Sequence, residues 1–107
     1  MEVFNIKNMK KGWFIGNFSP AVLKTERFEV GLHEYKKDNP TSNHYHKKST
    51  EINVIIEGKM IVNNQTLSAG DIFCFDPYVV SECTFLEDTK LIAVRDSSFP
   101  NDKYSAE

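Results

Sequence analysis

Hydrophobic and polar residues alternate with a period of two along several short segments of the chain. Residues 28–33 read Phe-Glu-Val-Gly-Leu-His, and because successive side chains of an extended strand point to opposite faces, they predict a strand with one buried face. Residues 51–56 read Glu-Ile-Asn-Val-Ile-Ile, are richer in β-branched residues and predict a strand buried on both faces. Further strands are expected at 71–75, 82–85 and 91–94.

Turn-forming residues separate these segments. Asn63-Asn64 stands between residues 60–62 and 65–67, and since asparagine tolerates a positive φ, the stretch predicts a hairpin. Asp76-Pro77 ends the strand at 71–75, because proline offers no ladder donor. No stretch has a convincing apolar helical stripe, so any helix is short and is expected near residues 20–23. Many short strands with frequent turns predict an all-β sandwich or barrel.

Length and composition limit the organisation to one domain. The chain has 107 residues, of which 40% are hydrophobic and 12% aromatic, which is enough for a single core. There are no internal repeats or linkers, so residues 1–107 are expected to form one domain. Residues 97–107 form a polar C-terminal tail, which Phe99 and Tyr104 are expected to order in part.

The charge balance excludes several classes of partner. Thirteen basic and 15 acidic side chains give a net charge of −2, whereas nucleic-acid binding needs a clustered basic face. No segment is apolar enough to span a membrane, and the first residues lack the apolar run of a secretory signal. Cys74 and Cys83 form no metal-binding pattern and are interpreted as buried, reduced thiols. A cytoplasmic protein that binds neither nucleic acid nor membrane is expected.

The sharpest chemical feature is the pair His44 and His46. In a strand, residues two apart point to the same face about 7 Å apart, so both imidazoles can reach one metal ion while Tyr45 points away. Glu51 follows after a polar run that can turn the chain, which would place it beside the histidines. A carboxylate buried at the head of so apolar a strand would be costly without a cation, which is why a metal site is predicted.

The spacing of these residues resembles a motif of the cupin superfamily. His44-x-His46-x4-Glu51-x6-Gly58 matches the first cupin motif, G(x)5HxH(x)3-4E(x)6G, except that Asp38 replaces its leading glycine. The second motif, G(x)5-7PxGxxH(x)3N, is matched only by Gly70 and Pro77. Tyr78-Val79 replaces its x-Gly step, Glu82 replaces its histidine and Leu86 its asparagine. The chain thus resembles a small single-domain cupin with an acidic residue in place of the last histidine.

This resemblance implies a jelly-roll β-barrel with a metal ion inside one open end. It assigns ligand roles to His44, His46 and Glu51. Glu82 inherits the fourth ligand position, where it can coordinate the ion, act as a general base or point into water. Since cupins often dimerise through their outer strands, a homodimer through the outward face of residues 52–56 is also implied.

Two imidazoles with one or two carboxylates suit Fe(II), Mn(II), Ni(II) or Zn(II). The site is expected to take a small-molecule ligand, and an isomerase- or epimerase-like reaction on a sugar or sugar-nucleotide derivative is one hypothesis, with Glu82 or Tyr35 moving a proton. His33 and Asn53 are further candidates to line the pocket. An Fe(II)-dependent dioxygenase and a non-catalytic ligand-binding or sensor domain remain alternatives.

Overall fold

The computed structural model describes all residues from 1 to 107, and strands make up most of its regular structure. Two 3-10 turns, η1 (Ile6–Asn8) and η2 (Lys10–Gly12), come first. The strands that follow are β1 (Trp13–Gly16), β2 (Leu23–Lys24), β3 (Glu29–Tyr35), β4 (His44–Tyr45), β5 (Glu51–Glu57), β6 (Lys59–Val62), β7 (Gln65–Ser68), β8 (Ile72–Phe75), β9 (Cys83–Phe85), β10 (Thr89–Arg95) and β11 (Tyr104–Ser105).

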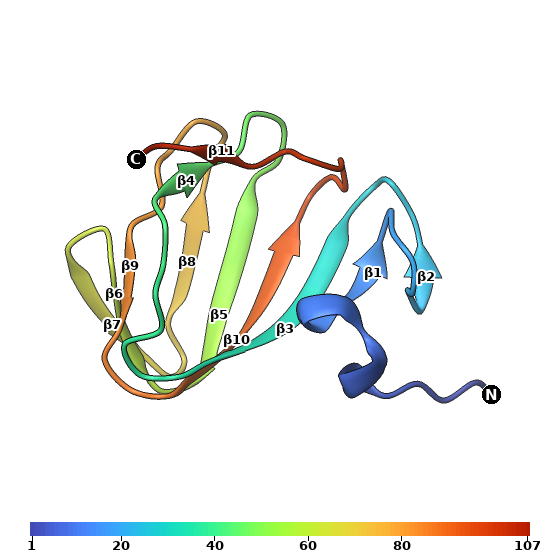
Figure 1. Cartoon of the computed structure of the whole chain (residues 1–107), viewed down its shortest axis with the longest axis horizontal. Coiled ribbons are helices and arrows are strands. Elements are labelled where there is room, and N and C mark those ends of the chain that lie inside the picture. Colours follow the sequence, from blue (N-terminus) through green and yellow to red (C-terminus); the bar gives the residue numbers. More distant parts are fainter.

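The strands form one large sheet faced by two small ones (Figure 1). The large sheet has the order β2-β1-β3-β10-β5-β8, and its four central strands are all antiparallel. The small sheets have the orders β7-β6-β9 and β11-β4. Apart from the pairs β1–β2 and β6–β7, the paired strands are not consecutive in the chain, so the fold depends on contacts between distant segments. None of its helices is long and apolar enough to cross a membrane.

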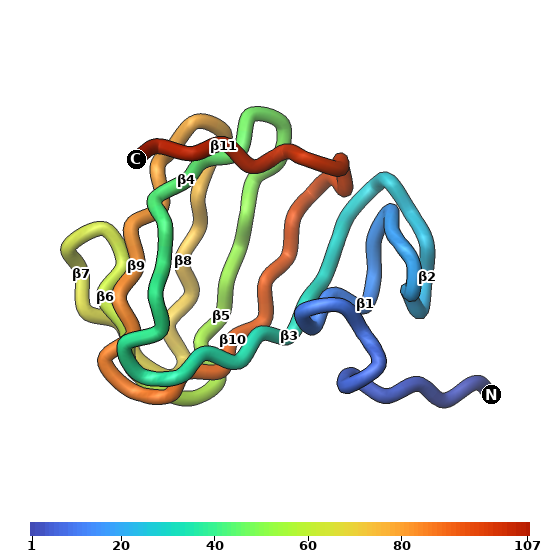
Figure 2. The backbone as a smooth tube through the Cα atoms, in the orientation of Figure 1, coloured from blue at the N-terminus to red at the C-terminus, as the bar shows by residue number.

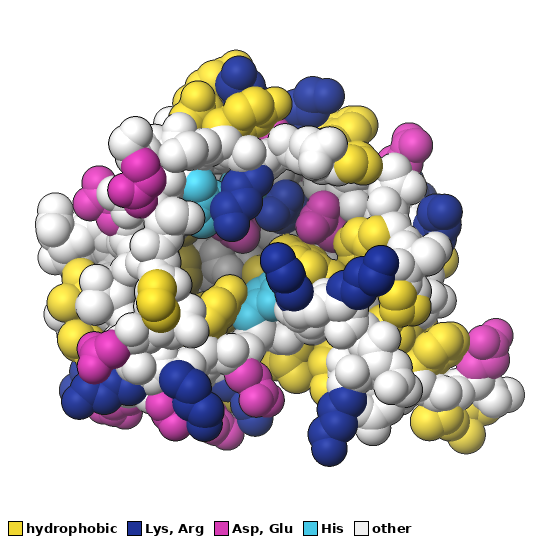
Figure 3. Space-filling model, in the orientation of Figure 1, with side chains coloured by type: hydrophobic (Ala, Val, Ile, Leu, Met, Phe, Trp, Pro, Cys, Tyr) yellow, Lys and Arg dark blue, Asp and Glu magenta, His cyan; other side chains and the backbone are white.

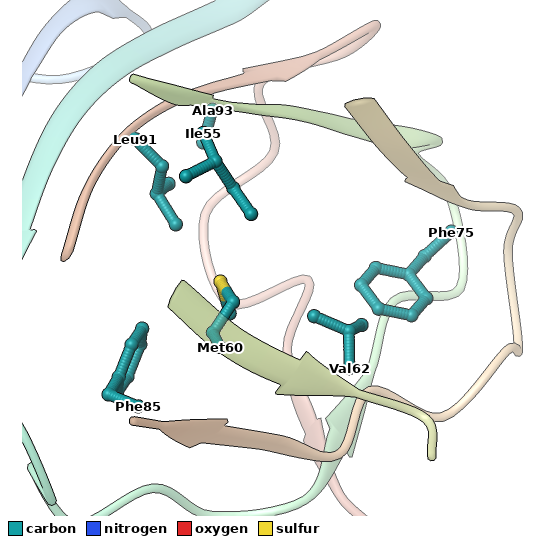
Figure 4. Close-up of a cluster of buried hydrophobic side chains, with 7 residues drawn as sticks. All are labelled: Ile55, Met60, Val62, Phe75, Phe85, Leu91 and Ala93. Carbon is teal, nitrogen blue, oxygen red and sulfur yellow. The ribbon is translucent and has the colours of Figure 1, made fainter. Parts of the chain in front are cut away.

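The hydrophobic core lies between the large sheet and β6 and β9 (Figure 4). Alternate residues of β5 and β10 point inward, where they meet the inward residues of β6, β8 and β9. The fully buried members are Ile55, Met60, Val62, Phe75, Phe85, Leu91 and Ala93. These side chains come from both the large sheet and the sheet of β6 and β9, so they hold the two sheets together.

The period-two pattern located the strands correctly, since every predicted strand is present within a few residues. The expected helix at 20–23 is wrong: η1 and η2 are the only helical turns, and the chain at 23–24 is the short strand β2. Residues 51–56 are not buried on both faces, because Ile52 and Ile56 are 43% and 41% exposed. Cys74 is a free thiol as expected, but it lies on this outer face and is exposed.

The hairpin prediction is confirmed. Strands β6 and β7 pair in antiparallel register from Lys59↔Ser68 to Val62↔Gln65, with two residues between them. Asn63 and Asn64 have φ values of 45° and 68°, as a two-residue primed turn requires. The turn also supports the next strand, because the Asn63 amide oxygen accepts a hydrogen bond from the backbone N–H of Glu82 at 2.8 Å.

Gly58, the last residue of the first motif, is required by both its conformation and its surroundings. It has φ +100°, and a Cβ there would lie 2.5 Å from the carbonyl oxygen of Asp88. Gly70 has a similar φ of +93°, but a Cβ there would meet nothing within 4 Å. Alanine substitutions at the two positions can therefore distinguish the cost of a positive φ, which both share, from the cost of steric overlap, which only Gly58 has.

Gly58→Ala is expected to destabilise the protein more than Gly70→Ala. Both replacements place a side chain at positive φ, which costs about 1–2 kcal/mol. Gly58→Ala must also displace backbone, which adds about 1–3 kcal/mol. Chemical denaturation of the two variants and the wild type measures the difference, and equal losses of stability would contradict the steric explanation.

Candidate metal centre

The structure brings His44, His46 and Glu51 together. The two histidines lie in and just after β4, a tight turn follows, and Glu51 begins β5. Their ligand atoms all lie within 4.8 Å of one another, and the two imidazole rings have centroids 5.4 Å apart. The cluster therefore consists of two nitrogen donors and one carboxylate.

Hydrogen bonds orient both imidazoles toward the cluster. Nδ1 of His44 lies 3.1 Å from the carbonyl oxygen of Ser42, and Nδ1 of His46 bonds the carbonyl oxygen of Asp102. Because a carbonyl only accepts, each Nδ1 carries a proton, so in the neutral imidazole Nε2 is the nitrogen with a lone pair for a metal. Backbone carbonyls often hold metal-binding histidines in this way.

One polar atom of the cluster lacks an interaction partner, which a cation could supply. Nε2 of His46 is buried and has no hydrogen-bond partner, and it lies 3.7 Å from the nearest carboxylate oxygen of Glu51. Buried polar groups of this kind are normally satisfied. A divalent ion coordinated by both Nε2 atoms and by the carboxylate would give each of these atoms a partner. The three residues therefore fit a metal.

The surroundings of the cluster shift the pKa values of Glu51 and His44 in the directions that favour cation binding. Burial alone would raise the pKa of Glu51, but the contact with His46 and the positive charge of Arg95 outweigh it and hold the pKa below its usual value. Burial lowers the pKa of His44, against the smaller effect of its bond to Ser42. A carboxylate that stays ionised beside an imidazole that stays neutral is the protonation state that metal binding needs.

The polar C-terminal tail is part of this site. Strand β11 pairs with β4 in antiparallel register, Tyr104 opposite Tyr45 and Ser105 opposite His44, and the C-terminal segment runs alongside β4 in Figure 2. Asp102 is buried, with 4% of its surface exposed. Its carboxylate accepts hydrogen bonds from the backbone N–H groups of residues 47–49 and from the Ser49 hydroxyl, at 2.9 to 3.3 Å.

Asp102 thus joins the tail to the turn between the histidines and Glu51. Its side chain holds that turn, while its carbonyl holds the ring of His46. The donors outweigh the effect of burial and lower the pKa of Asp102. The aromatic residues of the tail contact the same segment, as expected: Tyr104 stacks on Tyr45 with ring centroids 5.6 Å apart, and the Lys48 ammonium lies over the Phe99 ring. The carboxylate of Asp102 adds hydrogen bonds to residues more than fifty positions away, a role that residue spacing alone does not predict.

The structure does not bring Glu82 to the cluster, and of the three roles left open for this residue, its position is that of a side chain that points into water. Glu82 is exposed, whereas its neighbours Ser81 and Cys83 line the central cavity. Ser81 pairs directly with His44, so it is the residue of this segment on the same face as the histidine. Period two then sends Glu82 to the opposite face.

The turn before this segment contains a residue with an unusual backbone conformation. Tyr78 has φ +71°, a value that favours glycine over other residues. Its backbone N–H donates a hydrogen bond to the carbonyl oxygen of His46 at 2.7 Å, so this turn contacts the chain next to the cluster.

The cluster opens into a cavity of about 810 Å³ between the sheets, visible as a hollow in Figure 3 with histidine side chains in it and lysine and arginine side chains around it. His33, Tyr35 and Asn53 line this cavity, as does Trp13, whereas Phe14 does not. Nδ1 of His33 lies 2.8 Å from the carbonyl oxygen of Lys11, which leaves its Nε2 free. Burial lowers the pKa of His33 and raises the pKa of Tyr35.

Comparison with solved structures places this fold. The chain is similar to an uncharacterised protein with a double-stranded β-helix domain from Klebsiella pneumoniae, with a TM-score of 0.69 and 22% identity over 80% of this chain and 75% of that one. It is also similar to a protein from Planctomyces limnophilus, with a TM-score of 0.68 and 17% identity over 97% and 96% of the two chains.

A third similar structure is a sugar phosphate isomerase of the cupin superfamily from Silicibacter pomeroyi, with a TM-score of 0.62 and 16% identity over 76% of this chain and 57% of that one. No protein-family model matches the sequence. A search of curated proteins finds no match either. The expected all-β architecture is confirmed, and the chain has the double-stranded β-helix fold of the cupins.

Proposed function

We propose that this protein is a metal-dependent enzyme that moves a proton on a small polar molecule, in the manner of a sugar isomerase or epimerase. The observation that supports it most directly is the open cluster of His44, His46 and Glu51 at the end of a cavity. An ion of Fe, Mn, Ni or Zn bound there would supply Lewis acidity to a carbonyl or hydroxyl oxygen of the ligand.

Two side chains of the same cavity suit the proton transfer. His33 is neutral, and its free Nε2 can accept a proton from the carbon next to a carbonyl. Tyr35 keeps its phenolic proton because burial raises its pKa, so it can donate. Their rings are neighbours, with centroids 6.2 Å apart, and both line the cavity, so one ligand there can contact both. With Glu82 outside the site, His33 takes the role of base and Tyr35 keeps its predicted role.

Proton exchange with solvent tests this proposal without knowledge of the product. Metal-loaded protein in D₂O is expected to incorporate deuterium next to the carbonyl of at least one member of an aldose and ketose panel, followed by NMR. His33→Gln is expected to reduce the exchange rate by about 10²-fold or more. A variant that retains its metal and its exchange rate would contradict the role of His33.

The three-ligand set also favours a second candidate. Two histidines and one carboxylate with open positions are the ligand set of non-haem Fe(II) oxygenases, and without Glu82 the cluster matches that set. An oxygen electrode separates the candidates, because a dioxygenase consumes O₂ with Fe(II) and shows no deuterium exchange. If the protein shows neither O₂ consumption nor deuterium exchange across sugar, keto-acid and thiol panels, its function is to bind a ligand without catalysis.

We also propose that two copies of the chain pair through the outer face of the large sheet. Ile52, Ile56 and Ile72 are exposed on this face, next to half-buried Val54 and Ile92. An apolar surface of this kind usually marks an interaction site. It is continuous across β5, β8 and β10, as a twofold sheet-to-sheet contact requires.

Ile52→Lys is expected to convert the dimer to a monomer, because it would bury two ammonium groups in an apolar interface. Multi-angle light scattering measures the mass. Val79→Lys is the matched control, since Val79 is also 43% exposed but lies in a loop away from this face. A wild-type chain that is monomeric at micromolar concentration would contradict the proposal.

A further inference from the structure

Two buried nitrogen donors in the central cavity have no hydrogen-bond partner. Nδ2 of Asn53 is one, in a residue only 4% exposed, and Nε of Arg95 is the other. Both residues line the same cavity. Because an unpaired buried donor is costly, two in one place indicate that a group from outside the protein completes them.

The sheet register places these donors next to each other. Asn53 lies opposite Ala93 on β10, and Arg95 lies opposite Glu51 on β5, so Asn53 and Arg95 are diagonal neighbours on one face. Diagonal positions lie roughly 7 Å apart, a gap that a carboxylate with its two oxygens can bridge. Ala93, which lies two residues before Arg95 on β10, has a small side chain and lines the same cavity.

The charge of Arg95 is only partly neutralised by the protein. Its guanidinium lies 3.8 Å from the carboxylate of Glu29 and stacks over the ring of Trp13 at 5.3 Å. Its other acidic neighbour, Glu51, belongs to the metal cluster. If the proposed function holds, Glu51 coordinates the cation and no longer neutralises Arg95. The positive charge of Arg95 is then free to pair with an anionic group of the ligand.

The rest of the cavity lining is also cationic. Four basic and two acidic side chains line it, in a chain whose formal net charge is −2. The basic residues other than Arg95 are Lys7, Lys11 and Lys103. A concave site with a local excess of positive charge attracts anions and raises their local concentration.

We infer that the cavity binds the carboxylate of a small hydroxy or keto acid through Arg95 and Asn53, with its other oxygens directed toward His44, His46 and Glu51. This inference rests on the proposed function, and it names the class of its substrate. A carboxylate fits better than a phosphate, because it carries a single negative charge and Arg95 already shares its positive charge with Glu29.

Matched pairs of acids and amides test the inference. Isothermal titration of Mn(II)-loaded protein would compare lactate with lactamide and gluconate with gluconamide, which differ only in the charged group. The acids are expected to bind about tenfold or more tightly than the amides. Arg95→Met is expected to abolish this preference and Asn53→Ala to reduce it. Lys90→Met is the control and keeps it, because Lys90 lies on the same strand but does not line the cavity and pairs with Glu34 and Glu57.

Equal binding of acid and amide, binding of neither, or a preference that survives in Arg95→Met would overturn the inference. Stronger competition by inorganic phosphate than by lactate would overturn the carboxylate assignment. If Arg95→Met does not fold, Asn53→Ala and the wild-type comparison still decide. The metal content of each sample separates the two proposals: bound metal without acid preference refutes this inference alone, whereas acid preference without bound metal refutes the metal-dependent function alone.

Discussion

His46→Ala is expected to weaken the affinity for a divalent metal by at least about a hundredfold. His46 supplies the most buried donor of the cluster, with 4% of its surface exposed and its Nε2 unpaired. Loss of an outer-shell partner alone costs 10- to 100-fold in metal affinity, so loss of a ligand should cost no less. Alanine would also leave the carboxylate of Glu51 buried without its nearest neighbour.

Titration of metal-free protein with Mn(II), Fe(II), Ni(II) and Zn(II), combined with elemental analysis, measures this effect. The wild type should gain thermal stability on metal addition, because a ligand that binds only the folded state stabilises it, and His46→Ala should gain none. His33→Gln is the matched control, since His33 is a buried histidine of the same cavity that lies outside the cluster. Equal affinities for His46→Ala and the wild type would contradict the assignment of His46 as a ligand.

Asp102→Ala is expected to lower the free energy of unfolding by about 3 kcal/mol or more. The substitution leaves the donors of residues 47–49 without their acceptor, and each unsatisfied buried donor costs about 1–3 kcal/mol. Since this turn connects the histidines to Glu51, metal affinity should also fall about 10- to 100-fold. Denaturant unfolding and metal titration measure the two effects.

Asp88→Ala provides the control for this variant. Asp88 also accepts a backbone hydrogen bond, from Lys37 at 2.8 Å, but it is exposed, so its loss should change stability much less than the loss of Asp102 and leave metal affinity unchanged. If Asp102→Ala behaved like Asp88→Ala, the tail would have no structural role in the site.

The stabilisation by Asp102 should also depend on pH. Its pKa in the folded protein lies below the ordinary value of 3.8, so the folded state binds fewer protons than the unfolded state. The stabilisation is therefore complete above that value and is lost as the pH falls through the lower folded pKa. The stability difference between wild type and Asp102→Ala should narrow below about pH 3.8.

The sequence predicted the features that depend on local spacing. Period two located the strands, the pair of asparagines gave the hairpin, and the spacing of His44, His46 and Glu51 identified residues that the fold brings together. These predictions succeed because a strand and its next turn determine where such side chains point.

Register and distant contacts could not be predicted from the sequence. The motif spacing indicates Glu82 for the fourth position, but a shift of one residue in a strand exchanges its two faces, and Ser81 is the residue that pairs with His44. Asp102 and Arg95 meet the site only through β11 and β10, strands that pair with partners far away in sequence. Residue type alone also does not predict whether a side chain is buried: Cys74 was expected to be buried, but it lies on the outer face of the sheet and is exposed.

The most direct test of the metal centre is a crystal structure of metal-loaded protein, with anomalous scattering to locate the ion and elemental analysis to identify it. We predict one ion bound by Nε2 of His44, Nε2 of His46 and the carboxylate of Glu51, with Glu82 outside its coordination shell. An ion that contacts fewer than two of His44, His46 and Glu51 would contradict the assignment.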